Sequence, residues 1–267
     1  MSILKDLTLG QYLPADSVVH HLDPRTKLGS ALALMAVLMF VKSLMGFLPL
    51  CVGIVGVIGL SGISYSVVLR NIRAFRWLLL LTFFAHSFLT PGTEITVRDT
   101  IIPWITHEGL NQGALFTGRL ASIMVIAAIL TLTTAPIEVA DGLESLLSPF
   151  KRIGVPAHEL AMMMVIALRF IPTLVDEAGR LQKAQMARGA DFSGNPFRKA
   201  KKLTALLIPL MLSAFRRADD LAVAMDARCY RGGTGRTQYR ELAFEPMDGI
   251  AALALVSVIT ACYLLIS

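Results

Sequence analysis

Long apolar runs separated by short polar segments follow one another along most of the 267-residue chain. Several of these runs approach the length of about 20 residues with which a helix crosses the hydrocarbon core of a bilayer. Candidate spans lie at residues 29–45, 47–69, 77–90, 109–135 and 247–267, with a polar loop at 91–108. The pattern predicts an all-α integral membrane protein with about five transmembrane helices.

Composition agrees with this interpretation. Apolar residues make up 55% of the chain and the mean hydropathy is +0.64, whereas an ordinary soluble domain has about 45–50% apolar residues. The N-terminal segment has no short apolar core followed by a small-residue cleavage site, so we expect no signal peptide. The scattered cysteines, Cys51, Cys229 and Cys262, predict neither a disulfide framework nor a metal site.

Residues 136–246 contain two further apolar runs, 160–175 and 203–215, which allow a hairpin through the bilayer as an alternative. Both runs are short for spans, and Arg169 lies within the first. A hairpin would also place a group of basic residues opposite the other basic loops, against the positive-inside rule. That group is Arg180, Lys183, Arg188, Arg198, Lys199, Lys201 and Lys202. We therefore predict that residues 136–246 are cytoplasmic.

The same rule orients the whole chain. With residues 136–246 inside, all but three of the 25 Lys and Arg residues (Lys42, Arg98 and Arg119) lie on the side of the N-terminus. We predict a cytoplasmic N-terminus, an outer C-terminus and three parts. Residues 1–135 form an N-terminal arm and four transmembrane helices, residues 136–246 form a cytoplasmic domain, and residues 247–267 form the last transmembrane helix.

The cytoplasmic part is predicted to hold three amphipathic helices, the first of which begins near Pro136. The other two are about 30 residues long, and each is apolar in its first half and charged in its second. They open at Pro156 and Pro196, close at Arg188 and Arg228, and carry internal prolines, Pro172 and Pro209, where we expect bends. Helices this apolar must rest on a partner protein or on the membrane surface.

The charged halves of the two long helices repeat one motif. The stretches EAGRLQKAQMARGADF, from residue 177, and RADDLAVAMDARCYRG, from residue 217, superimpose when shifted by 40 residues. Each has a row of small or apolar side chains that would let another surface approach the backbone closely. The two rows are Ala178, Leu181 and Ala184 in the first stretch and Ala218, Leu221 and Ala224 in the second.

Each row ends in an Ala-Arg pair: Ala187-Arg188-Gly189 and Ala227-Arg228-Cys229. An arginine at the last turn complements the negative end of the helix, and its guanidinium can also reach carboxylates or carbonyls of a docked protein. A single such end is ordinary; two at matching phase favour docking points for a pseudo-symmetric pair of partners. We expect Gly189 in the left-handed position after the helix, and a different end at Cys229 because that conformation is costlier for Cys.

Three other features leave alternatives open. Arg119 lies about ten residues into the fourth span, where it is either paired in the protein interior or extends to the interface. His20 and His21 suggest a metal site, but adjacent side chains diverge and no further ligand is near, so a solvated or partner-facing role is favoured. The cluster Met162–Met164 is either core or an adaptable contact surface, and we favour contact.

These motifs resemble the transmembrane T component of energy-coupling factor transporters, which are ABC-type importers of vitamins and transition-metal ions. The resemblance is carried by GQYLPADSVVHHLDPRTK near the start, ALRFIPTL and KAQMARGADF in the middle, and AMDARCYRGG near the end, and it covers nearly the whole chain. It implies an L-shaped fold in the cell membrane of a prokaryote. The long N-terminal arm is closer to the type shared among several substrate-binding subunits than to the metal-dedicated type.

The resemblance also implies partners. The two Ala-Arg motifs would end coupling helices, each seated in a groove of one of two ABC ATPase subunits. ATP and Mg would be bound by those subunits, so this chain would be a non-catalytic subunit without a cofactor, and no phosphate-binding GxxxxGK[ST] motif occurs in it. A substrate-binding membrane subunit, the S component, would contact the apolar halves of the helices. The residues expected there are Met162, Met163, Met164, Leu206, Leu207 and Leu210; no nucleic acid is expected.

Two rival classes remain. Phosphatidyl-alcohol transferases also have an Ala-Arg pair near acidic residues, and Asp219, Asp220 and Asp226 are candidates for holding a divalent ion. Asp219 and Asp226 are seven residues apart, however, or about 10 Å along a helix, and the spaced Asp-Gly-Ala-Arg pattern of that family is missing. An ordinary ABC permease would offer one coupling segment per chain rather than two.

Overall fold

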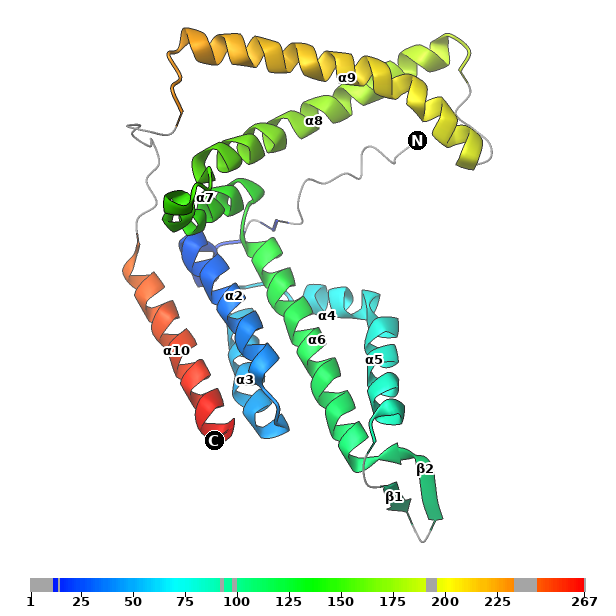
Figure 1. Cartoon of the computed structure of the whole chain (residues 1–267), viewed down its shortest axis with the longest axis vertical. Helices are drawn as coiled ribbons and strands as arrows, with labels where there is room; N and C mark the ends of the chain where they lie inside the picture. Colours follow the sequence, from blue (N-terminus) through cyan, green and yellow to red (C-terminus); the bar gives the residue numbers. More distant parts are fainter. Residues whose placement is uncertain are drawn as a thin grey trace. The chain divides into compact units, whose positions relative to one another are not determined.

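The computed structural model describes residues 12–13, 15–91, 94–97, 100–190, 196–232 and 244–266. Helices account for most of this described part (Figure 1). The chain divides into two compact units, one comprising Gly10–Leu143 with Arg240–Ser267 and the other built on Glu144–Tyr239.

The first unit has a core between four helices: α2 (Pro24–Phe40), α3 (Leu44–Leu60), α6 (His107–Thr133) and α10 (Pro246–Ile266). Large apolar side chains fill the space between them, including Leu38, Leu50, Ile54, Ile126 and Cys262. Local sequence sets the helix starts. Asp23 accepts a hydrogen bond from the Arg25 N–H with Pro24 at the first helical position, and Ser43 accepts one from the Met45 N–H.

The prediction of a single span over residues 47–69 is wrong. Helix α3 ends at Leu60, and a glycine with φ of 66°, Gly62, reverses the chain. A separate short helix follows, α4 (Tyr65–Ala74), which meets α5 (Arg76–Leu89) at a bend of 61°. The prediction of a loop at 91–108 is also incomplete, because this stretch contains an antiparallel hairpin of β1 (Glu94–Val97) and β2 (Thr100–Thr106). In β1 the apolar Ile95 and Val97 alternate with the polar Glu94 and Thr96, which is a strand pattern.

Helix length and composition support a membrane protein. Among the described residues, α6, α10 and α8 (Ala157–Ala187) are long and apolar enough to cross a bilayer, and the bent pair α4–α5 counts as a fourth candidate. Helix α3 is a shorter apolar helix. The chain is therefore an all-α membrane protein with one hairpin, while the count of five spans and the position of α8 outside the membrane stay predictions.

Arg119 has a partner in the structure. Its guanidinium donates to the carbonyl oxygen of Val41 at 2.7 Å and lies 4.8 Å from the centre of the Phe116 ring. Val41 is the C-cap residue that follows the last residue of α2. A cation there complements the negative helix terminus, so Arg119 ties the end of α2 to α6, which settles the alternative in favour of pairing.

A buried polar network joins the opposite ends of the same helices. The Lys27 ammonium donates to the carbonyl oxygens of His20 at 2.8 Å and Thr133 at 3.3 Å. The Asp23 N–H donates to the carboxylate of Asp248 at 2.9 Å. Because Lys27, Asp23 and Asp248 are all at most 6% exposed, each depends on these partners, and together they hold the start of α2, the end of α6 and the start of α10.

Helices α5 and α6 approach each other through glycines spaced as Gly-x-x-x-Gly, a pattern that lets membrane helices pack closely. A Cβ atom at Gly113 would lie 2.9 Å from the Phe83 carbonyl oxygen, and one at Gly109 would lie 2.8 Å from that of Ser87. Backbone atoms cannot move aside as a flexible side chain can, so larger residues are excluded at both positions.

We expect Gly113→Ala to destabilise the protein by about 1–3 kcal/mol, the usual range for overpacking a close contact. The matched control is Gly29→Ala on α2, where a Cβ atom meets nothing within 4 Å. That change should be neutral or stabilising, since alanine favours a helix over glycine. Thermal unfolding in detergent measures both; an unchanged midpoint for Gly113→Ala would contradict the close approach.

Candidate functional site

The second unit is dominated by two long helices. Helix α7 (Pro136–Leu147) and a 3₁₀ turn, η1 (Ser148–Ile153), lead into α8 (Ala157–Ala187), and α9 (Pro196–Ala227) follows. Both predicted endpoints are close: the two long helices end one residue before Arg188 and Arg228. Pro172 and Pro209 lie inside continuous helices, and the bends expected there stay a prediction.

Helices α8 and α9 cross each other in antiparallel directions (Figure 1). At the crossing, the Arg217 guanidinium donates to the Glu177 carboxylate at 2.8 Å, and Arg180 adds a longer contact of 3.7 Å to the same carboxylate. Farther along, the Tyr230 hydroxyl lies 3.0 Å from the sulfur of Met162. From the first contact to the second, the residue number rises from Arg217 to Tyr230 on the α9 side and falls from Glu177 to Met162 on the α8 side. The two helices are therefore antiparallel.

The crossing lies at equivalent positions of the sequence repeat. Glu177 and Arg217 are 40 residues apart, which is the shift that superimposes the two Ala-Arg motifs. Each arm from the crossing to its arginine is therefore 11 residues long, or about 16 Å along a helix. The ion pair thus joins equivalent residues of the two motifs, and Arg188 and Arg228 follow it at the same distance along the sequence.

The two helix ends have the same geometry. After α8, the Gly189 N–H donates to the Met186 carbonyl at 3.0 Å and the Ala190 N–H to the Gln185 carbonyl at 2.9 Å. After α9, the corresponding hydrogen bonds run from Cys229 to Asp226 at 2.9 Å and from Tyr230 to Met225 at 3.1 Å. This pair of bonds is the Schellman motif, with its left-handed residue at Gly189 (φ 87°) and Cys229 (φ 56°).

The expectation for Gly189 is confirmed, whereas the expectation that Cys229 ends its helix differently is wrong. Cys229 is the one non-glycine residue with positive φ in the described part of the chain. A left-handed conformation costs an L-residue about 1–2 kcal/mol, and the two carbonyls capped by the motif offset that cost, since they would otherwise be unsatisfied.

We expect Cys229→Gly to stabilise the end of α9, by up to about 1 kcal/mol, because it relieves the left-handed strain. Gly189→Ala should do the opposite at the end of α8 by introducing it. Hydrogen exchange at the amides of residues 229 and 230, and at 189 and 190, measures each end separately. Equal exchange in Cys229→Gly and the parent would show that the cysteine is not strained.

Both motif arginines are exposed, and within the described residues neither has an ion pair or hydrogen bond through its guanidinium. Ala187, Ala227, Gly189 and Cys229 are exposed beside them. The predicted rows are exposed at Ala184, Ala218 and Ala224 and half-buried at Ala178, Leu181 and Leu221. The structure thus presents two similar ends, each with a free cation and small neighbours.

The apolar halves of the helices expose part of the predicted contact set. Met163 is 56% and Leu207 57% exposed, whereas Leu206 is only 8% exposed. Met164 and Leu210 are half-buried, and Met162 is half-buried with its sulfur against Tyr230. On α9 the exposed apolar surface continues through Ile208, Met211, Leu212 and Phe215. Of the predicted contact set, Met163 and Leu207 are therefore the exposed members, while Leu206 is buried.

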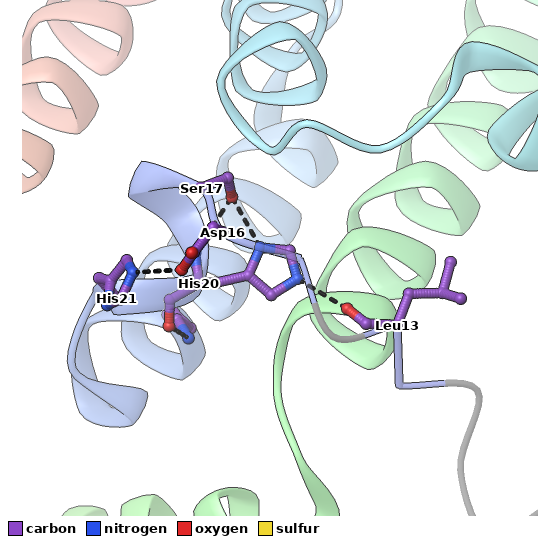
Figure 2. Close-up of polar contacts among 6 residues, drawn as sticks. Leu13, Asp16, Ser17, His20 and His21 are labelled. Atoms are coloured by element: carbon purple, nitrogen blue, oxygen red, sulfur yellow. Dashed lines mark hydrogen bonds and ion pairs between the residues drawn. The ribbon is translucent and has the colours of Figure 1, made fainter.

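The adjacent histidines do not converge (Figure 2). The His20 ring lies 2.6 Å from the Ser17 hydroxyl and 3.1 Å from the Leu13 carbonyl oxygen, while His21 lies 3.2 Å from the Asp16 carboxylate. Within the described residues no group of three or more His, Cys, Asp or Glu side chains could hold a metal ion. Asp219, Asp220 and Asp226 are exposed on α9 and form no such group.

Comparison with known proteins gives the family. The sequence profile of the CbiQ family, described as "Cobalt transport protein", matches residues 15–239. The chain belongs to the CbiQ family.

Close relatives have the name "Energy-coupling factor transporter transmembrane protein EcfT". The protein of that name from Thermosediminibacter oceani is 49% identical over 252 residues, which cover 94% of this chain and 94% of the relative. The one from Thermanaerovibrio acidaminovorans is 48% identical over 259 residues, 97% of this chain and 95% of the relative. The one from Bacillus subtilis is 39% identical over 255 residues, 95% of this chain and 96% of the relative.

CbiQ-family proteins are membrane subunits of transporters and not catalytic enzymes, so the alternative of a lipid-metabolising enzyme is not retained. Sequence reasoning on this family member missed the Glu177–Arg217 pair. The sequence holds a signal for it, because Glu177 is the first residue of one superimposed stretch and Arg217 is the first residue of the other.

Proposed function

We propose that this CbiQ-family chain is the coupling subunit of an energy-coupling factor importer. It links ATP hydrolysis by two ATPase subunits to a separate substrate-binding membrane subunit. The cargo would be vitamins or related micronutrients, with transition-metal ions as the alternative. The chain itself binds no cofactor in this scheme, and ATP and Mg bind to the ATPases.

One observation carries the proposal: two similar Schellman ends with exposed arginines, which lie at equivalent positions of the 40-residue repeat on the antiparallel helices α8 and α9. A pair of similar subunits is matched by a pair of similar docking points. Each guanidinium can donate several charge-assisted hydrogen bonds in a groove lined by carboxylates or carbonyls. The small residues beside it, such as Ala187 and Ala227, permit close approach.

The apolar halves of α8 and α9 supply the other contact of the scheme. An exposed apolar strip of this kind marks an interaction site, and in the proposal it meets the substrate-binding subunit. When the ATPases close on ATP, the helix ends they grip would move toward each other. The angle at the Glu177–Arg217 crossing would then change and reshape the apolar surface around Met163 and Leu207.

The scheme requires α8 and α9 on the cytoplasmic side of the cell membrane, together with the N-terminus. The positive charge between the apolar halves of these helices supports that side, although α8 is long and apolar enough to cross a bilayer. A cysteine substituted for Lys201, in a variant in which Cys51, Cys229 and Cys262 are replaced by serine, should react only with reagent on the cytoplasmic side. Reaction from outside would overturn the topology.

Co-purification tests the function directly. The chain expressed with two ATPases of an energy-coupling factor system and one substrate-binding subunit should form a complex that takes up substrate with ATP. An ordinary permease would transport without the separate binding subunit. Recovery of the chain alone, with no ATPase bound, would contradict the proposal.

A further inference from the structure

The first unit contains a cavity of about 390 Å³ between α2, α3, α6 and α10, with α1 (Val18–His21) at one end. This volume falls in the range of small-ligand sites, about 300–1,000 Å³. Three of its lining residues are polar, Lys27, Ser30 and Thr133, and the other lining residues are apolar or glycine. The cavity lies outside the helix pair discussed above.

Small residues keep the cavity open. Gly53 and Gly56 line it from α3, and Ala251 and Ala254 line it from α10. A Cβ atom at Gly56 would meet nothing within 4 Å. An unfilled apolar space forfeits dispersion contacts along its walls, and water compensates only near Lys27, Ser30 and Thr133, because it needs polar partners that the rest of the lining lacks.

The cavity has a depth and a direction. Its lining runs from Lys27 to Leu34 on α2 and from Leu60 back to Gly53 on α3, which is about 10 Å along each helix. On α10 it runs from Met247 to Val258, about 16 Å. One leaflet of a bilayer is about 15 Å deep. The charged residue lies at the end where α2 and α10 begin, so the cavity extends from the membrane surface to about the midplane.

We propose that this cavity binds one acyl chain of a phospholipid from the leaflet in which α2 and α10 begin. The match is a long apolar space, one leaflet deep, with its polar residues at the surface end. The Lys27 ammonium already donates to two carbonyls, and Asp23 and Asp248 are buried close to it. The site therefore recognises the acyl chain of the lipid and not the charge of its headgroup. This assignment is independent of the proposed coupling function.

The test is retention of lipid by the purified full-length chain. The protein is exchanged into detergent with palmitoyl-oleoyl phosphatidylglycerol or phosphatidylcholine, and bound lipid is counted by native mass spectrometry. The parent should keep one lipid of either kind at detergent concentrations that strip the rest. Gly56→Leu fills the cavity and should lower that retention at least tenfold. Gly29→Leu, on α2 and outside the lining with equally free space at its Cβ atom, should retain lipid as the parent does.

A second variant and its control test the cavity from its α10 wall. Ala254→Leu projects into it from α10, whereas the exposed Ala252 does not line it, so Ala252→Leu is the control. If Gly56→Leu fails to fold, this pair decides. Parent-like retention by a folded cavity-filling variant would overturn the proposal, as would a parent that holds no lipid. A strong preference of the parent protein for phosphatidylglycerol over phosphatidylcholine would overturn the claim that only the acyl chain is recognised.

Discussion

Replacing both motif arginines by glutamate should abolish recovery of the complex with its ATPases. Arg188 and Arg228 are exposed at equivalent helix ends and have no partner within the described part of the chain, so the substitutions should leave the chain itself folded. Loss of one member of a buried, hydrogen-bonded charged pair costs an interface about 2–5 kcal/mol. That corresponds to roughly 30-fold or more in affinity at each end.

Each single variant should weaken the complex and reduce transport, since both ends must be held for the helices to move. Lys183→Glu is the matched control, because Lys183 is exposed on α8 one turn before the motif and carries the same charge. Co-purification and ATP-dependent uptake measure the effect. If the double variant recovered both ATPases at the parent yield, the assignment of the helix ends as docking points would be wrong.

Reversing one charge at the helix crossing should uncouple ATP binding from movement of the apolar surface. Arg217→Glu would place two carboxylates where the structure has a 2.8 Å ion pair. The side chains of Arg217 and Glu177 are 31% and 24% exposed. The cost is therefore on the order of 1–2 kcal/mol, between that of an exposed pair and that of a buried one. The crossing angle would no longer be held at one value.

Spin labels at positions 163 and 207, both exposed in the parent, report that angle. In the assembled complex the parent should give one distance distribution without ATP and another with it. Arg217→Glu should give a broad distribution that ATP changes little. The double exchange Glu177→Arg with Arg217→Glu should restore part of the response. Restoration is incomplete because the new arginine at 177 faces Arg180, which now contacts Glu177 at 3.7 Å.

Arg216→Glu is the control for this series, since it makes the same change at the neighbouring exposed position. A parent-like response in Arg217→Glu, with the ATPases shown to close in the same sample, would exclude the crossing as a pivot. Loss of the response in Arg216→Glu as well would indicate a general effect of charge on α9.

The helical membrane fold and the positions at which α8 and α9 end were predictable because they rest on local signals. Apolar runs, prolines at helix starts and the 40-residue repeat are all properties of neighbouring residues. The break at Gly62 and the α4–α5 bend were not predictable in this way. The apolar sequence continues past Leu60, and tertiary packing decides where it turns.

The long-range polar contacts of the first unit do not show in the sequence for a related reason. The pairing of Arg119 with Val41 spans 78 residues and the link between Asp23 and Asp248 spans 225, so neither shows in a local pattern. At the end of α9 the prediction was wrong for another reason: a different helix end was expected at Cys229, and the structure has the same Schellman motif as at Gly189. The cost of a left-handed cysteine was known, but the two hydrogen bonds that offset it depend on the folded backbone.

The ion pair at the crossing also bears on why one chain carries both helices. Residues 177 and 217 are counterparts in the 40-residue repeat, so a symmetric dimer of a single helix that met at this position would set glutamate against glutamate or arginine against arginine. Only two diverged copies can place opposite charges there. Once the copies differ, a pair of non-identical partners can be assigned to fixed ends. Because both helices belong to one polypeptide, every complex contains one copy of each helix. Two separate subunits would have to assemble in a fixed ratio to give the same result.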